Sequence, residues 1–199
     1  MARAKSIPTV DPTASITAHA AVAIGTRLDE LYSYDYAVAD AALVTDLHEM
    51  RIAAKRLRYT MDVFAPAFEQ YTSLSEQFKA ATSVVKLLQQ YLGDIHDADV
   101  LVPQLLTELT AAMDGIRPKS RGKKPASDPV GVHLVDLDSC RGILSVCEDA
   151  RSARDEAFSK LQMEWDRLKA ESYSDGLRKL LRAAITEQTV AQVLHEQAE

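Results

Sequence analysis

His48-Glu-Met-Arg51-Ile-Ala-Ala-Lys55-Arg56-Leu-Arg58-Tyr59 carries the most informative helical pattern in the sequence. At about 100° per residue, a helix brings His48, Arg51, Lys55 and Arg58 within roughly 80° of one another; these four residues are called the basic stripe below. The apolar residues of the stretch and of the turn after it lie on the opposite side: Met50, Ala53, Leu57, Met61 and Phe64. The spacing therefore predicts an amphipathic helix that buries one face and presents a row of positive groups on the other.

The basic stripe has the chemistry of an anion site. Arginine offers a planar fork that suits phosphate oxygens, lysine adds a compact charge, and His48 can join as a donor. Asp62 is the only acidic residue within the arc of the stripe, so the cations are under-neutralised inside their own helix. The pattern favours a polyanion with charges repeated along a line, and the alternative is a solvated face with routine salt bridges. Arg56 lies about 80° to the other side of His48 and is expected to make a flanking or inter-helix contact.

Composition predicts a helical domain without a strong bias toward nucleic acid. The chain has 199 residues, 47% hydrophobic content, seven glycines and seven prolines, which favours an all-α protein with one sizeable core. The net charge of −6 argues against a general nucleic-acid binder. No apolar run is long enough to span a membrane and no apolar secretory segment is present, so we expect a cytoplasmic protein. Cys140 and Cys147 are expected to be reduced core residues.

Periodicity and breakers divide the chain into about six helices. Residues 1–13 read as an N-terminal tail, and residues 14–198 as one helical domain that contains a basic flexible linker at about 114–133. Within the domain, the expected helices cover 14–32, 46–64 with Asp46 as N-cap and Pro66 as terminator, 73–92, 94–113, 136–170 and 174–198. Gly93-Asp94 is expected to break or kink the third of these helices away from the fourth.

Other cations are expected to complete an anion groove with the basic stripe. Lys79 and Lys86 are seven residues apart and share the polar side of the helix expected over 73–92. Arg151 and Arg154 occupy positions of two apolar series on the helix over 136–170. Two cations aimed inward suggest a wet cavity, and the alternative is that their long stems snorkel to the surface.

The dipeptide His96-Asp97 raises a competing hypothesis, a metal-dependent phosphohydrolase of the HD type. In that reading, His48, His96, Asp97 and either Asp136 or Asp138 would hold the metal. The objection is electrostatic, because a divalent cation at His48 would meet the fixed charges of the stripe. We therefore expect Asp97 to orient a cation of the stripe and His96 to add an anion contact. No nucleophile turn and no phosphate-cradling glycine loop is present.

Two segments resemble the CHAD family, the conserved histidine α-helical domain. Leu47-His-Glu-Met-Arg-Ile-Ala-Ala-Lys-Arg-Leu-Arg-Tyr59 is similar to the family's His-x-x-Arg-hydrophobic-x-x-Arg/Lys-Arg-Leu-Arg signature. Lys86-Leu-Leu-Gln-Gln-Tyr-Leu-Gly-Asp-Ile-His-Asp-Ala-Asp-Val-Leu101 is similar to Lys-x-x-x-x-x-Leu-Gly-x-x-Arg/Asn-Asp-x-x-Val-Leu. With the order of the helices, the resemblance covers about residues 14–195. His96 departs from the residue usual before the Asp.

The resemblance implies a CHAD-like helical bundle whose basic central groove or pore binds inorganic polyphosphate without catalysis. It implies a cytoplasmic protein with no cofactor and no metal, often associated with polyphosphate granules or with triphosphate-processing domains. Carried over by position, the binding residues are His48, Arg51, Lys55, Arg56, Arg58 and Lys86. Family members often carry a second ladder of this kind, which we do not find after the linker. The groove is therefore expected to be smaller, open on one side, or completed by a second copy in a homodimer. A helical protein-interaction scaffold is the third hypothesis.

Overall fold

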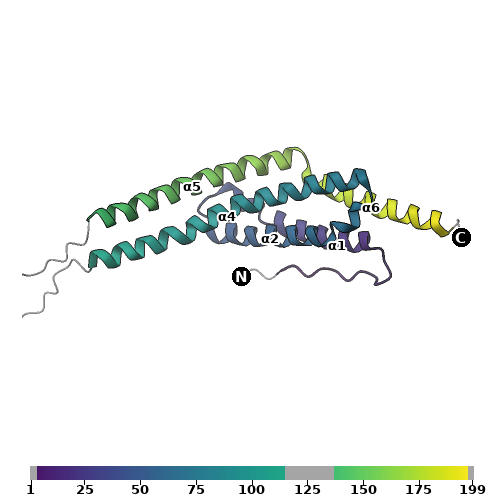
Figure 1. Ribbon diagram of the computed structural model, residues 1–199, viewed down its shortest axis with the longest axis horizontal. Helices are drawn as coiled ribbons and strands as arrows, with labels where there is room; N and C mark the ends of the chain where they lie inside the picture. The colour runs from purple at the N-terminus through teal and green to yellow at the C-terminus, as the bar shows by residue number, and fades with distance from the viewer. Residues whose placement is uncertain (1–3, 115–136, 197–199) are drawn as a thin grey trace, which may run out of the picture. The chain divides into compact units, whose positions relative to one another are not determined.

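The computed structural model describes residues 4–114 and 137–196, and these residues are helical apart from their connections. The elements are α1 (Ile16–Tyr32), the 3-10 helix η1 (Asp35–Ala39), α2 (Val44–Phe64), α3 (Pro66–Glu69), α4 (Thr72–Asp114), α5 (Leu137–Ala170) and α6 (Tyr173–Glu196) (Figure 1). No strand occurs in the described ranges. The predicted all-α fold is confirmed.

The contacts divide the chain into two compact units. Unit 1 comprises Met1–Gly93 and Ala157–Glu199, and unit 2 comprises Asp94–Glu156. Both α4 and α5 pass from one unit into the other, since the boundaries fall inside these helices. Unit 1 contains the basic stripe.

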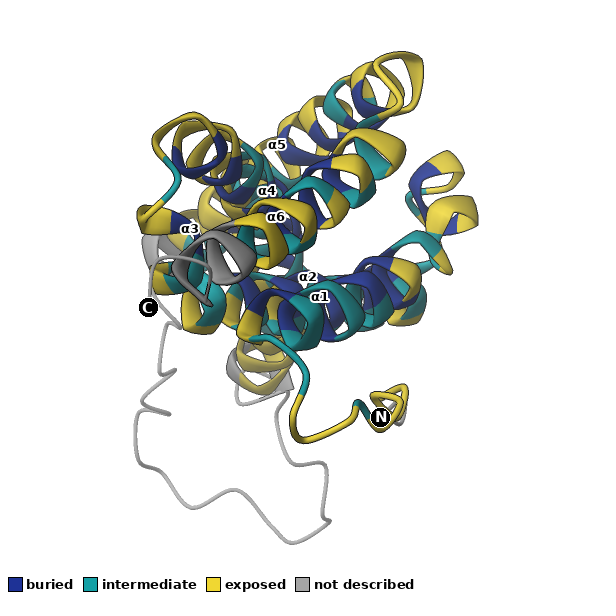
Figure 2. Cartoon of the chain, turned by 90° about the vertical axis from the view of Figure 1, so that its right-hand side faces the viewer, coloured by how far each residue is buried: buried dark blue, intermediate teal, exposed yellow. Residues whose placement is uncertain are grey.

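The helix that carries the basic stripe is α2, and its buried face follows the predicted pattern. Met50, Ala53, Leu57 and Met61 are fully buried, and α2 packs against α1 through this side (Figure 2). The expected N-cap at Asp46 is wrong, because α2 begins at Val44 and Asp46 lies in its first turn. The Asp46 carboxylate instead accepts a hydrogen bond of 2.9 Å from the Tyr36 hydroxyl.

Helix α1 lies between α2 and α6 and is held at its C-terminal end by an aromatic cluster. The ring of Tyr32 packs on that of Trp165 with 4.9 Å between centroids, and Trp165 Nε1 donates to Asp35 Oδ1 at 2.5 Å. Burial, together with the charge of Asp35, raises the pKa of Tyr32 to about 12. At the other end of α1, Ile16 is 49% exposed.

The predicted break at Gly93-Asp94 is also wrong, because α4 is one continuous helix from Thr72 to Asp114. A glycine inside a helix costs about 1 kcal/mol relative to alanine, which lowers the helix propensity without forbidding the conformation. The neighbouring Leu92 and Ile95 are each 1% exposed. Burial of these two side chains offsets the cost and keeps the backbone helical across Gly93.

The described residues before α1, 4–15, contain no helix and are anchored on α1. Lys5 Nζ donates to the backbone oxygen of Asp29 at 3.1 Å, and Arg27 Nη1 donates to the backbone oxygen of Lys5 at 2.9 Å. Ser15 caps the start of α1 by accepting from the amide of Ala18. The segment before α1 is therefore part of the packed structure of unit 1.

Unit 2 contains the C-terminal part of α4 and the N-terminal part of α5, which run antiparallel (Figure 1). Its buried apolar residues include Ile95, Ala98 and Cys147. The flexible linker predicted at about 114–133 lies outside the described residues except for Asp114, the last residue of α4. Among the described helices, none is long and apolar enough to cross a membrane.

Candidate functional site

The basic stripe lies on the side of α2 that faces away from the packed core. Arg51 is half-buried and Lys55 is exposed. Neither side chain forms an ion pair or hydrogen bond with a described residue. His48 is half-buried one turn before Arg51. Arg51 and Lys55 thus present two charges that the described part of the fold does not neutralise.

Helix α4 brings a further cation to the end of the stripe. Arg58 Nε lies 3.5 Å from Asp62 Oδ2, and Lys86 Nζ lies 3.8 Å from Asp62 Oδ1. Arg58 Nη1 also donates to Gln89 Oε1 at 3.1 Å. These contacts place Lys86 beside Arg58, with one carboxylate between the two cations.

The balance of charge on this surface is strongly positive. Arg51, Lys55, Arg58 and Lys86 supply four positive charges, and Asp62 is their one ion-pair partner among described residues. The Asp62 side chain is 42% exposed, so water screens its attraction for either cation. Like charges a few Å apart repel one another, and an anion lying along the surface would relieve that repulsion.

Tyr59 organises two of the cations, a role that the sequence reasoning missed. Lys55 Nζ lies 5.7 Å and Arg58 Cζ 5.0 Å from the centroid of its ring, within the range of cation–π attraction. Tyr59 itself is 48% exposed. The signal was in the sequence, since a tyrosine four residues after a lysine lies on the same helix face.

Arg56 belongs to a different cluster, as its position on the helix indicated. Its guanidinium pairs with Glu30 of α1, and Arg27 Nη1 contacts the other oxygen of the same carboxylate at 2.7 Å. Glu30 is 4% exposed. The three side chains join α1 to α2, so Arg56 is already used in packing, although the family resemblance made it a binding residue.

Lys79 is exposed on α4, two helical turns before Lys86. Seven residues of α-helix return to nearly the same face, so both lysines lie on one side of α4, as predicted. The remaining predicted binding residues belong to unit 2: His96, Arg151 and Arg154.

Arg154 is held by a carboxylate that the sequence reasoning did not select. Its Nε lies 2.5 Å from Asp99 Oδ1 and its Nη2 3.4 Å from Asp99 Oδ2. Both side chains are 14% exposed. The guanidinium of Arg154 on α5 thus pairs with the carboxylate of Asp99 on α4 through two nitrogens. This ion pair explains a cation at this position without a wet cavity.

Arg151 is exposed, which agrees with the alternative that its stem reaches the surface. His96 is half-buried and Asp97 is exposed on α4. A pairing of Asp97 with a cation of the basic stripe would join the two units and stays a prediction.

The metal hypothesis gains no support from the described residues, which contain no group of three or more His, Cys, Asp or Glu side chains able to hold an ion. Asp136 lies outside the described residues, as does the side chain of Asp138. The HD-type arrangement therefore stays an untested alternative.

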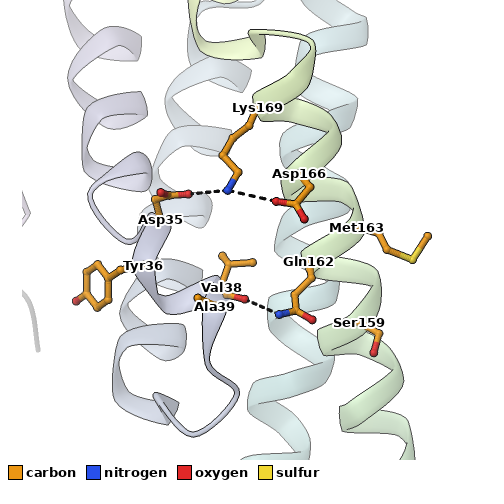
Figure 3. Close-up of a pocket in the computed structure, with 9 residues that line it drawn as sticks. All are labelled: Asp35, Tyr36, Val38, Ala39, Ser159, Gln162, Met163, Asp166 and Lys169. Carbon is orange, nitrogen blue, oxygen red and sulfur yellow. Dashed lines mark hydrogen bonds and ion pairs between the residues drawn. The ribbon is translucent and has the colours of Figure 1, made fainter.

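A pocket between η1 and α5 shows how differently charge is arranged elsewhere in unit 1. It encloses about 570 Å³, and Lys169 Nζ lies between Asp35 Oδ1 at 3.5 Å and Asp166 Oδ1 at 3.2 Å (Figure 3). Gln162 crosses the pocket to donate to the backbone oxygen of Val38 at 2.9 Å. One cation between two carboxylates is neutralised, so this pocket is unsuited to a polyanion.

The fold and the surface together define a helical domain with an exposed basic row on its second helix. A family model for the CHAD domain matches residues 2–106, and the chain belongs to this family, which is linked to polyphosphate binding. The match spans α1 to α3 and most of α4 and ends before α5. No curated protein and no solved structure matches the chain.

Proposed function

We propose that the protein binds inorganic polyphosphate along α2 without chemically altering it. The observation that carries the proposal is a group of four cations, Arg51, Lys55, Arg58 and Lys86, whose one ion-pair partner among described residues is Asp62, which contacts Arg58 and Lys86. A chain of phosphates supplies negative charge at regular intervals, and it can neutralise successive side chains of a row.

The length and chemistry of the row suit such a ligand. From His48 to Arg58 the helix rises about 15 Å, which is long enough for several consecutive phosphates to lie on it. Arg51 and Arg58 can each present a fork to phosphate oxygens, and Lys55 adds a point charge between them. Lys86 and then Lys79 extend the path onto α4. We propose that Arg56 and Arg154 contribute little, because Glu30 and Asp99 already hold them.

The decisive experiment is a titration with long-chain polyphosphate at low and moderate salt. Each cation near a polyanionic surface is worth about 1 kcal/mol, so Arg51→Ala/Arg58→Ala should weaken binding about thirtyfold. The matched control is Arg141→Ala/Arg182→Ala, which removes two exposed arginines elsewhere and changes the net charge equally. Equal binding by the stripe variant and the wild type, or an equal loss in the control, would contradict the proposal.

Salt dependence tests the electrostatic origin of the binding. By analogy with single-stranded nucleic acids, the logarithm of the affinity should fall with the logarithm of salt by about 0.7 for each phosphate contacted. The slope for Arg51→Ala/Arg58→Ala should be shallower than that of the wild type. A slope near zero would show that the binding does not depend on phosphate neutralisation.

The lack of catalysis is part of the proposal and has its own test. Elemental analysis of the purified protein and an assay with a generic phosphate ester separate a binding module from an HD-type hydrolase. A stoichiometric divalent metal together with turnover would favour the hydrolase. If charge reversal along the stripe altered only solubility, the scaffold hypothesis would replace both.

We also propose a cytoplasmic location at polyphosphate granules. A fluorescent fusion should co-localise with stained granules, and the stripe variant should spread through the cell. Identical distributions of the two proteins would contradict this location.

A further inference from the structure

A second pocket in unit 1 differs in character from the basic stripe. It is an open groove of about 450 Å³ between the N-terminal segment, α1 and α2, a volume typical of small-molecule sites. Most of its wall is carbon, and its lining includes Ile7, Pro8, Val10, Ala23, Val63 and Phe64. Val63 is 73% exposed and Ile7 41%, so the mouth of the pocket presents apolar surface to water.

The polar side chains of this pocket already make bonds within the fold. His19 Nδ1 lies 2.9 Å from the backbone oxygen of Ser15, and Thr60 Oγ1 donates to the backbone oxygen of Arg56 at 2.8 Å. A polar ring such as a nucleobase would find few partners here, and its buried donors and acceptors would lose hydration without compensation. An alkyl chain has no such groups and gains from leaving water.

Two cations lie close to one residue of the pocket lining. Tyr59 lines the pocket, and its ring centroid lies within 6 Å of both Lys55 Nζ and Arg58 Cζ, at 5.7 and 5.0 Å. An apolar chamber next to two cations complements a molecule with an apolar tail and an anionic head. The size of the pocket suits one free chain.

We infer that this pocket binds a free single-chain anionic amphiphile, with its alkyl tail among Val63, Phe64 and the N-terminal segment and its head group at Lys55 and Arg58. The inference goes beyond the proposed function and shares only these two cations with it. Because the head group occupies cations of the stripe, polyphosphate and the amphiphile should compete.

The contribution of the alkyl tail to affinity can be tested by calorimetric titration with hexyl, octyl and decyl phosphate. Each is kept below its micelle-forming concentration. Burying one methylene is worth about fourfold in affinity, so affinity should rise by about that factor per added carbon. Decyltrimethylammonium has the same tail and the opposite charge and should not bind. An affinity independent of tail length, or equal binding of the cationic amphiphile, would overturn the inference.

Variants separate this pocket from the polyphosphate surface. Val63→Asn should lower the affinity for decyl phosphate at least tenfold and leave the affinity for polyphosphate unchanged. Val190→Asn alters another exposed valine and should change neither affinity. Lys55→Ala should lower the affinity for both ligands. The inference fails if Val63→Asn binds decyl phosphate like the wild type. It also fails if anionic phospholipid vesicles bind while monomeric decyl phosphate does not. If decyl phosphate binds and polyphosphate does not, only the proposed function is contradicted.

Discussion

Arg58 in unit 1 and Arg154 in unit 2 both lie near an aspartate, yet the two pairs differ in kind. Arg154 meets Asp99 through two nitrogens, and both side chains are 14% exposed. Arg58 Nε lies 3.5 Å from Asp62 Oδ2. The Asp62 side chain is 42% exposed and also forms an ion pair with Lys86. The first arginine has one carboxylate to itself, whereas the second shares a carboxylate with another cation.

Residue type alone therefore does not identify an anion site. Both arginines were selected from the sequence as binding residues, but a buried fork on a carboxylate is a structural cross-link. A row of cations that shares one solvated carboxylate keeps a net positive charge. The burial of the carboxylate, and whether a second cation shares it, therefore separate a structural arginine from one available to a ligand. Both sides of this comparison can be tested.

The largest expected effect is on the structural side. Asp99→Ala would leave Arg154 mostly buried without its carboxylate, and we expect a loss of about 2 kcal/mol in the free energy of unfolding of unit 2. This is less than the 3–5 kcal/mol of a fully buried pair, because both side chains retain some contact with water. Hydrogen exchange of the amides along α4 and α5 measures the loss locally.

The control for this substitution is Glu148→Ala, which removes an exposed acid from the same unit and should change little. Polyphosphate affinity should be the same in both variants, since Arg154 is assigned a structural role. If Asp99→Ala tightened polyphosphate binding while leaving exchange unchanged, Arg154 would belong with the ligand-binding cations.

Local helix geometry was readable from the sequence, whereas longer-range partners were not. The buried face of α2 follows from a period of 3.6 residues, and Met50, Leu57 and Met61 are buried as this period requires. The continuity of α4 through Gly93 was missed because a local propensity of about 1 kcal/mol is overridden by the packing of Leu92 and Ile95, which periodicity could not weigh against it.

The same distinction holds for the candidate site: positions on one helix could be predicted, and partners on another helix could not. The shared arc of Arg51, Lys55 and Arg58 is a property of one helix and could be predicted. The pairing of Arg154 with Asp99 joins residues 55 positions apart, and the contact of Arg56 with Glu30 joins residues 26 apart. No periodicity in one helix predicts which acid on another helix will meet its cations.

The second prediction sharpens the ligand-binding side of the comparison. Asp62→Asn removes the shared carboxylate and keeps its shape, so Arg58 and Lys86 would face the ligand without a competing anion. We expect polyphosphate to bind about fivefold more tightly, since one charge near a polyanion is worth about 1 kcal/mol. Stability should change by less than 1 kcal/mol, as for other solvated pairs.

The matched control is Glu187→Gln, an exposed acid on α6 that forms no ion pair with a described residue. It makes the same change in net charge and should alter the affinity much less. Equal gains in the two variants would show that overall charge, and not the carboxylate beside Arg58, sets the affinity.

The smallest expected effect is on stability without ligand. If Arg51 is repelled by its neighbours and has no acid partner among described residues, Arg51→Gln should raise the free energy of unfolding by about 0.3 kcal/mol at low salt, the scale of helix charge pairs. Arg167 is the counterpart, because it pairs with Glu164 at 2.5 Å and Glu171 at 2.6 Å, so Arg167→Gln should lower stability. In about 1 M salt the Debye length falls to about 3 Å, and both differences should vanish in denaturant titrations. A loss of stability for Arg51→Gln at low salt would mean that the fold itself neutralises the stripe, which would remove the electrostatic reason for a polyanion to bind there.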